Sequence, residues 1–243
     1  MSLKVKTKID WCNYTWNPVW GCLKYPPCKY CYARKIAKRF AKQVVDKLLK
    51  NETQNWKKET EKRLYHFLPT WLPENFKKSF PKKPSKIFVN SMSEIYFWEK
   101  KWMESVLNKI EKYPQHVFMF LTKFPWVYKD YFFSENCWLG VTITDTNSNL
   151  NHKLYCYVKN NIRFISFEPL LKFDFSDFLT YCINPKPDWI IIGAQTNPYK
   201  PPKREWVEKI IETAKKQNVP IFLKDNLYRA YSDLPVLKEF PEK

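Results

Sequence analysis

The chain alternates between short apolar runs and stretches with the spacing of amphipathic helices. The apolar runs are hydrophobic almost throughout, which is typical of parallel strands covered on both faces. They cover residues 86–92, 116–122, 137–142, 162–167, 189–193 and 219–223, and a further extended segment is expected near residues 10–19.

Three stretches place their apolar residues on one helical stripe. The first runs from Ala33 to Leu48, the second contains Trp102, Val106 and Ile110, and the third runs from Trp206 to Ala214. The alternation predicts an α/β fold, a complete or partial βα (TIM-like) barrel with parallel strands. We expect a single domain over residues 1–243, with a basic, aromatic-rich excursion at about 51–83.

The balance of charged residues indicates which class of partner the chain binds. Lys and Arg total 42 against 24 acidic residues, a formal net charge of +18. A field of this sign attracts polyanions, so nucleic acid is the expected partner, although a surface rich in lysine for thermal stability gives the same count. No secretory signal or membrane-length apolar run is present, which predicts a cytoplasmic protein without a membrane partner. The seven cysteines are then metal ligands or buried thiols rather than disulfides.

The small number of glycines excludes two common nucleotide-binding motifs. The chain has three glycines, Gly21, Gly140 and Gly193, and they lie far apart in the sequence. A Rossmann fingerprint or a P-loop needs several glycines within one short loop, because the backbone must approach the phosphates closely.

A cluster of cysteines precedes the first predicted helix. Cys22, Cys28 and Cys31 have the spacing C-x5-C-x2-C, and three thiolates on a short loop suit a soft metal site. A structural zinc would take a fourth ligand, for which Cys12 is available. A [4Fe–4S] cluster held by three cysteines would instead leave one iron open to a small molecule.

The cysteine segment and the motifs after it resemble a known family. Cys28-Lys-Tyr-Cys31 is similar to the end of the radical S-adenosylmethionine (SAM) signature, and Ser91-Met-Ser-Glu94 to a cofactor-contacting segment at the end of a strand. The chain resembles a phage- and prokaryote-associated three-cysteine-motif family related to radical SAM proteins. Further resembling segments are Thr15-Trp-Asn-Pro18, Gly21-Cys22, Leu121-Thr-Lys123, Trp138-Leu-Gly-Val141 and Phe164-Ile-Ser-Phe-Glu-Pro-Leu-Leu171.

The resemblance implies a fold of radical SAM type and two cofactors, a [4Fe–4S] cluster on Cys22, Cys28 and Cys31, and SAM. Tyr30 matches the residue near the adenine, and Glu94 the position near the methionyl amino group, although Glu94 could also complement the start of a helix. The SAM-binding residues expected from the resemblance and from the ends of strands are Tyr30, Ser91, Ser93, Glu94, Thr122, Lys123 and Glu168. The first cysteine interval is longer than in radical SAM enzymes in general, as is usual in the resembling family. The chain departs from that family where a Gly-Gly-Glu-Ser-like stretch is replaced by Gly193-Ala-Gln-Thr196, which leaves Gln195 a weak candidate.

Basic residues gather in two stretches that are expected to contact nucleic acid. Aromatic residues interleave with the second stretch, an arrangement that suits stacking of single-stranded or flipped-out bases. The alternative is a solvated surface whose aromatic residues point inward. The expected contacts are Arg34, Lys35, Lys38 and Arg39, then Lys77, Lys78, Lys82 and Lys83.

The leading hypothesis is therefore a radical SAM enzyme that forms a 5′-deoxyadenosyl radical with an electron donor and acts on nucleic acid. Base modification and DNA repair both fit. The alternatives are a non-catalytic nucleic-acid-binding protein with a structural zinc site, and an iron–sulfur electron-transfer partner of another enzyme.

Overall fold

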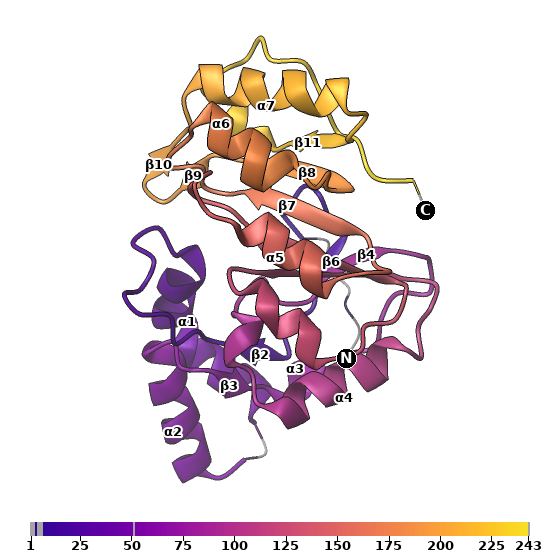
Figure 1. Cartoon of the computed structure of the whole chain (residues 1–243). Coiled ribbons are helices and arrows are strands. Elements are labelled where there is room, and N and C mark those ends of the chain that lie inside the picture. Colours follow the sequence, from indigo (N-terminus) through magenta and orange to yellow (C-terminus); the bar gives the residue numbers. More distant parts are fainter. Residues whose placement is uncertain (1–2, 4–6, 51, 243) are drawn as a thin grey trace. The chain divides into compact units, whose positions relative to one another are not determined.

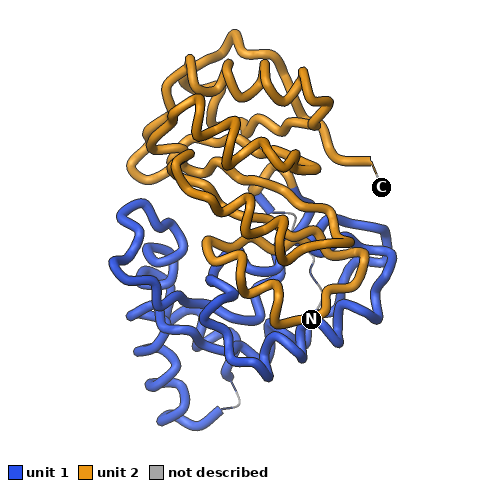
Figure 2. The backbone as a smooth tube through the Cα atoms, in the orientation of Figure 1, with its two compact units in different colours: residues 1–8, 12–118 blue, residues 9–11, 119–243 orange. Residues whose placement is uncertain are grey.

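The computed structural model describes residues 3, 7–50 and 52–242. The chain forms two compact units (Figure 2): residues 1–8 and 12–118 make the first, and residues 9–11 and 119–243 the second. Asn51, where the predicted excursion begins, lies outside the described residues.

The first unit contains a parallel strand pair and an antiparallel pair. Strand β1 (Tyr14–Thr15) runs parallel to β4 (Lys86–Phe88), with Tyr14 opposite Ile87. The first residue of β5 (Val117–Thr122) joins this edge, because the Val117 amide donates to the Ser85 carbonyl (3.0 Å). Strand β2 (Val19–Trp20) pairs antiparallel with β3 (Thr70–Trp71).

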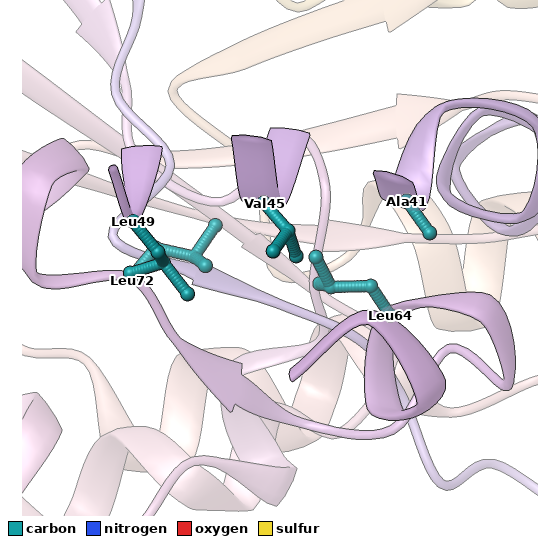
Figure 3. Close-up of a cluster of buried hydrophobic side chains, with 5 residues drawn as sticks. All are labelled: Ala41, Val45, Leu49, Leu64 and Leu72. Atoms are coloured by element: carbon teal, nitrogen blue, oxygen red, sulfur yellow. The ribbon is translucent and has the colours of Figure 1, made fainter. Parts of the chain in front are cut away.

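Helices of the first unit connect and flank these strands, with α1 (Tyr32–Leu48) and α2 (Gln54–Tyr65) beside β2 and β3 (Figure 1). The others are α3 (Pro73–Phe76), the 3₁₀ turn η1 (Ile95–Phe97) and α4 (Lys100–Ile110). Helix α1 packs on α2 through the apolar stripe seen in the sequence. Figure 3 shows Ala41, Val45 and Leu49 facing Leu64 and Leu72, all at most 3% exposed. Burial of such side chains is the main favourable contribution to helix packing.

The second unit is built on parallel strands in the order β5-β6-β7-β8-β11, of which β5 contributes its last four residues. These strands are β6 (Cys137–Thr142), β7 (Arg163–Phe167), β8 (Trp189–Ile192) and β11 (Ile221–Leu223). Every residue of β8 is fully buried, as expected for a strand covered on both faces. Gly140 of β6 is required there, because a Cβ would lie 2.4 Å from the Phe164 ring.

The remaining elements of the second unit connect or flank those strands. They are η2 (Pro125–Asp130), α5 (Leu150–Tyr157), α6 (Phe175–Asp177), η3 (Phe178–Ile183), a hairpin of β9 (Gln195–Thr196) and β10 (Tyr199–Lys200), α7 (Arg204–Lys216) and η4 (Asp225–Leu227).

The structure confirms the α/β class with parallel strands. Three expected strands are at least two residues shorter than predicted: β4 ends at Phe88, β11 begins at Ile221, and only Tyr14–Thr15 and Val19–Trp20 are extended pairs in the region of residues 10–19. Across the described ranges, none of the helices has the length and apolar character needed to cross a membrane.

Candidate functional site

The cysteine loop connects β2 to α1 in the first unit. Its backbone is held at both ends, because the Cys22 amide donates to the Phe67 carbonyl (2.9 Å) and the Cys31 amide donates to the Cys28 carbonyl (3.1 Å). All three thiols are half-buried, and none forms a disulfide.

Backbone amides point at two of the sulfur atoms. The Cys22 sulfur accepts from the Lys24 amide, and the Cys31 sulfur accepts from the Arg34 amide, each at 3.4 Å. The second contact makes Cys31 the residue that caps the N-terminus of α1. Amide donors of this kind stabilise negative charge on sulfur, which is the form that binds a metal.

Burial sets the protonation state of Cys22. Its pKa is raised to about 11, mainly because burial disfavours the thiolate, and the negative charges of Glu94, Cys31 and Cys28 raise it further. The same interactions show that these four groups are electrostatic neighbours. Cys22 is therefore a neutral thiol at pH 7 in the metal-free protein.

A glycine joins the loop to the segment Ser91–Glu94. The Gly21 amide donates to the Met92 carbonyl (3.0 Å), and the Glu94 amide donates to the Gly21 carbonyl (3.2 Å). Gly21 has a φ of +116°, and a Cβ there would lie 2.2 Å from the Leu68 carbonyl oxygen. Only glycine fits this position, and its two hydrogen bonds bring Glu94 next to the cysteine loop.

Two further side chains hold the same segment. Asn17 accepts from the Met92 amide (3.0 Å) and donates to the Ser91 hydroxyl (2.9 Å), while the Tyr32 hydroxyl donates to the Ser91 carbonyl (2.6 Å). In the sequence, Asn17 stands out only as part of a resembling segment, without a role of its own. The one feature that could have identified it is its place directly before Pro18, in the short connection between β1 and β2.

The predicted cofactor-binding residues of this segment also have structural partners. The Ser93 hydroxyl accepts from the Trp98 indole (3.1 Å). Glu94 is 8% exposed and accepts from the Tyr96 amide (3.5 Å), so it caps η1. The alternative expectation for Glu94, a carboxylate at the start of a helical turn, is confirmed, and the cofactor role stays a prediction. Tyr30 lies half-buried in the loop.

Arg34 belongs to the cysteine loop as well as to α1. Its guanidinium donates to the carbonyls of His66 (3.3 Å) and Cys22 (3.5 Å) and lies over the Phe67 ring (5.1 Å). Its Nε is buried and has no hydrogen-bond partner within the described ranges. These contacts explain why Arg34 is less available to a phosphate than the exposed Lys35, Lys38 and Arg39 on the same helix.

The second predicted basic stretch is only partly available to a polyanion. Lys77 is exposed and pairs with Glu74 (2.8 Å), and Lys82 and Lys83 are exposed. Lys78 is half-buried, and burial together with the charge of Lys47 lowers its pKa.

Two aromatic residues of the same region face the interior. Phe67 is 2% exposed and Phe80 is 7% exposed, and Phe80 packs edge-on against Trp16 with ring centroids 4.9 Å apart. Because their faces are covered, Phe67 and Phe80 cannot stack on a base. The alternative expectation of inward-pointing aromatic residues therefore holds for these two.

The other predicted cofactor residues lie in the second unit, at the ends of its strands. Thr122 is buried and accepts from the Phe124 amide (2.9 Å), and Lys123 is half-buried. Glu168 accepts from the Ser166 hydroxyl (2.9 Å) and from the Lys224 ammonium. Sequence reasoning did not connect Glu168 with Ser166 or Lys224, since pairing across three parallel strands cannot be read from spacing.

Gly193 makes room for this ion pair. A Cβ at Gly193 would lie 2.8 Å from both the Glu168 carboxylate and the Lys224 side chain. Gln195, the weak candidate nearby, lies in the β9–β10 hairpin and donates to the Pro198 carbonyl (2.8 Å).

The donor set of the cysteine loop fits an iron–sulfur cluster in its chemistry. It offers three thiols, amide donors to two of the sulfurs, and the buried Nε of Arg34 beside them. Among the residues that the structure describes, no three His, Cys, Asp or Glu side chains stand close enough to form a metal-binding group. Binding would therefore require the loop to draw its sulfur atoms together.

The sequence matches a family described as "Protein of unknown function (DUF5131)" over residues 6–231. The chain belongs to this family. The match spans both units of this DUF5131 protein, including the cysteine loop and the Glu168–Lys224 pair. No curated protein and no solved structure matches the chain.

Proposed function

We propose that this chain is a radical SAM enzyme that binds a [4Fe–4S] cluster through Cys22, Cys28 and Cys31 and acts on nucleic acid. The observation that carries the proposal is the connection of the cysteine loop to Ser91–Glu94 through Gly21. It puts an acidic residue beside three thiols, which suits a cofactor that carries an ammonium group and binds next to a cluster.

The loop can rearrange without disturbing a packed core. Leu23 is 53% exposed and Tyr25 is 91% exposed, so neither side chain contributes substantially to the interior. The ends of the loop are fixed by Phe67 and by the start of α1. Loading a cluster would thus move residues 23–30 while Gly21 and Glu94 keep their positions.

When bound, a [4Fe–4S] cluster and SAM supply a 5′-deoxyadenosyl radical that abstracts hydrogen from a substrate. The residues of the chain would hold the reactants: the three thiolates would bind the cluster, Glu94 would accept from the ammonium group of SAM, and Arg34 would balance negative charge near Cys22. An external electron donor would supply the one electron that breaks the C5′–S bond of SAM, with methionine as the leaving group. The partial βα barrel is the scaffold that we propose for this chemistry, with polar residues after each strand.

The test is anaerobic reconstitution with iron and sulfide, followed by measurement of iron content, electron paramagnetic resonance and 5′-deoxyadenosine. We expect a brown protein with about four irons per chain, a reduced signal that changes when SAM is added, and formation of 5′-deoxyadenosine. Cys28→Ala should lose the cluster. Cys156→Ala is the matched control, because Cys156 is an exposed thiol on α5 outside the loop, and it should keep the cluster.

Two results would contradict the proposal. A colourless protein that holds zinc, and releases it in Cys12→Ala, would identify a structural zinc site instead. A cluster whose signal does not respond to SAM would indicate an electron-transfer protein.

A further inference from the structure

Three tryptophans line a pocket in the first unit that contains none of the predicted site residues. The pocket has a volume of about 580 Å³ and is formed by α2, β3 and α4 with the segments next to them. Trp71 and Trp102 lie nearly parallel, with an interplanar angle of 19° and ring centroids 6.2 Å apart. Trp56 adds a third indole that is 49% exposed.

The charges that line the pocket cancel. Glu59 and Glu99 carry two negative charges, and Arg63 and Lys101 carry two positive ones. Lys101 pairs with Glu99 at 2.9 Å. A neutral aromatic lining fits an uncharged planar ring, whereas a quaternary ammonium group is best held where acidic residues are in excess. The carboxylates can accept hydrogen bonds from the amino groups of such a ring.

Exposed lysines outside the pocket lining lie on the same two helices. Lys58 and Lys62 on α2 and Lys100 on α4 are exposed, and the whole chain carries a net charge of +18. Basic residues beside aromatic faces are the combination that binds single-stranded nucleic acid, because the lysines track phosphates while the bases stack.

We propose that this pocket binds a nucleobase of single-stranded DNA or RNA by stacking on its indole rings. The inference rests on the nucleic-acid part of the proposed function and is independent of the cluster. It assigns base stacking to the exposed Trp56 and the half-buried Trp71, with the buried Trp102 packed behind Trp71, rather than to the covered rings of Phe67 and Phe80.

The test compares Trp56→Ala with Tyr65→Ala in binding to short single-stranded DNA and RNA oligonucleotides, measured by fluorescence anisotropy across salt concentrations. Both residues lie on α2 with similar exposure, 49% and 45%, and only Trp56 lines the pocket. We expect Trp56→Ala to weaken binding about 10-fold without changing the salt dependence, since an indole contacts bases and not phosphates. Tyr65→Ala should bind like the wild type. Adenosine monophosphate should quench tryptophan fluorescence in the wild type and less in Trp56→Ala.

Three outcomes would overturn the proposal, and they have different consequences. If the wild type binds oligonucleotides and Trp56→Ala binds equally well, only the pocket assignment fails. If choline quenches the tryptophan fluorescence and adenosine monophosphate does not, the pocket takes a quaternary ammonium group. If the wild type binds no oligonucleotide even at low salt, the nucleic-acid part of the proposed function fails too. The radical SAM part is tested separately, by the formation of 5′-deoxyadenosine.

Discussion

Cys22 is the residue whose reactivity is best defined by its surroundings. Burial and nearby negative charge raise its pKa to about 11, so only roughly one Cys22 in a thousand is a thiolate at pH 8. In the metal-free protein, alkylation of Cys22 by iodoacetamide should therefore be slow at pH 8 and rise about tenfold per pH unit toward pH 11. Peptide mapping by mass spectrometry measures this rate, with the exposed Cys156 as an internal reference for accessibility. Equal labelling of the two cysteines at pH 8 would contradict the assignment.

Arg34 donates hydrogen bonds to two backbone carbonyls outside α1, whereas Arg39 on the same helix lies over the Phe40 ring (5.1 Å) on the helix surface. Truncation to Ala leaves the carbonyls of Cys22 and His66 without this donor and removes the cation from the Phe67 ring. We expect Arg34→Ala to lower the free energy of unfolding by about 2 kcal/mol. The exposed Arg39→Ala should change it by less than about 0.5 kcal/mol. Urea unfolding of both variants gives the comparison, and similar losses would show that the guanidinium contacts contribute little.

At the scale of elements, the Glu168–Lys224 ion pair connects the residue that follows β7 with the residue that follows β11, on the two sides of β8. The two side chains are only 18% and 16% exposed, so removing one partner leaves a poorly solvated charge. We expect Glu168→Gln or Lys224→Met to lower the free energy of unfolding by about 2 kcal/mol each, reduced from the fully buried case by the remaining exposure. The double variant should cost less than the sum of the two.

A double-mutant cycle by chemical denaturation measures this coupling. Additive losses would mean that the two charges do not interact in solution. The matched control is the exposed pair Lys216–Glu212 on α7, whose cycle should give a coupling below about 1 kcal/mol.

The long apolar runs and helical stripes were predictable because burial alone determines them. The strands β5, β6, β7 and β8 start and end within about one residue of the predicted runs, since each run is covered on both faces. The prediction extended β4 to Met92, but its pairing ends at Phe88. After Phe88, the chain is held by hydrogen bonds from Met92 and Glu94 to Asn17 and Gly21 instead of by strand pairing. Such isolated hydrogen bonds leave no periodic pattern in the sequence.

The candidate site was less predictable than the strands. The spacing of the cysteines marked the loop, and the end of an apolar run marked Glu94. The partners of Arg34, Asn17 and Lys224 depend on contacts over long sequence separations, so no local pattern could give them. The pocket tryptophans were equally hidden, because a helical stripe does not distinguish a core residue such as Trp102 from the wall of a cavity.

At the scale of the whole molecule, the net charge of +18 is concentrated in the first unit, which has 25 Lys and Arg against 9 acidic residues, whereas the second unit has 17 against 15. Exposed lysines occur on α1, in the stretch that contains Lys82 and Lys83, and on α7. A charge concentrated in this way attracts a polyanion mainly to the first unit, and local contacts then decide where on it the polyanion binds. The effect of total charge on binding can be separated from the effect of local contacts by measuring the salt dependence, because only phosphates that the protein contacts contribute to its slope.

Binding of single-stranded oligonucleotides should therefore weaken steeply with salt, and reversal of local charges should flatten the slope. We expect Lys82→Glu with Lys83→Glu to reduce the slope of log Kd against log salt by about 1 to 2, as each lost phosphate contact removes about 0.7. The control is Lys203→Glu with Lys215→Glu in the second unit, which changes the net charge equally at two other exposed lysines. Titrations by fluorescence anisotropy at several salt concentrations measure both slopes. If the two double variants flatten the slope equally, overall charge rather than the 77–83 stretch governs binding; if the wild type binds nothing at low salt, its basic surface serves another purpose.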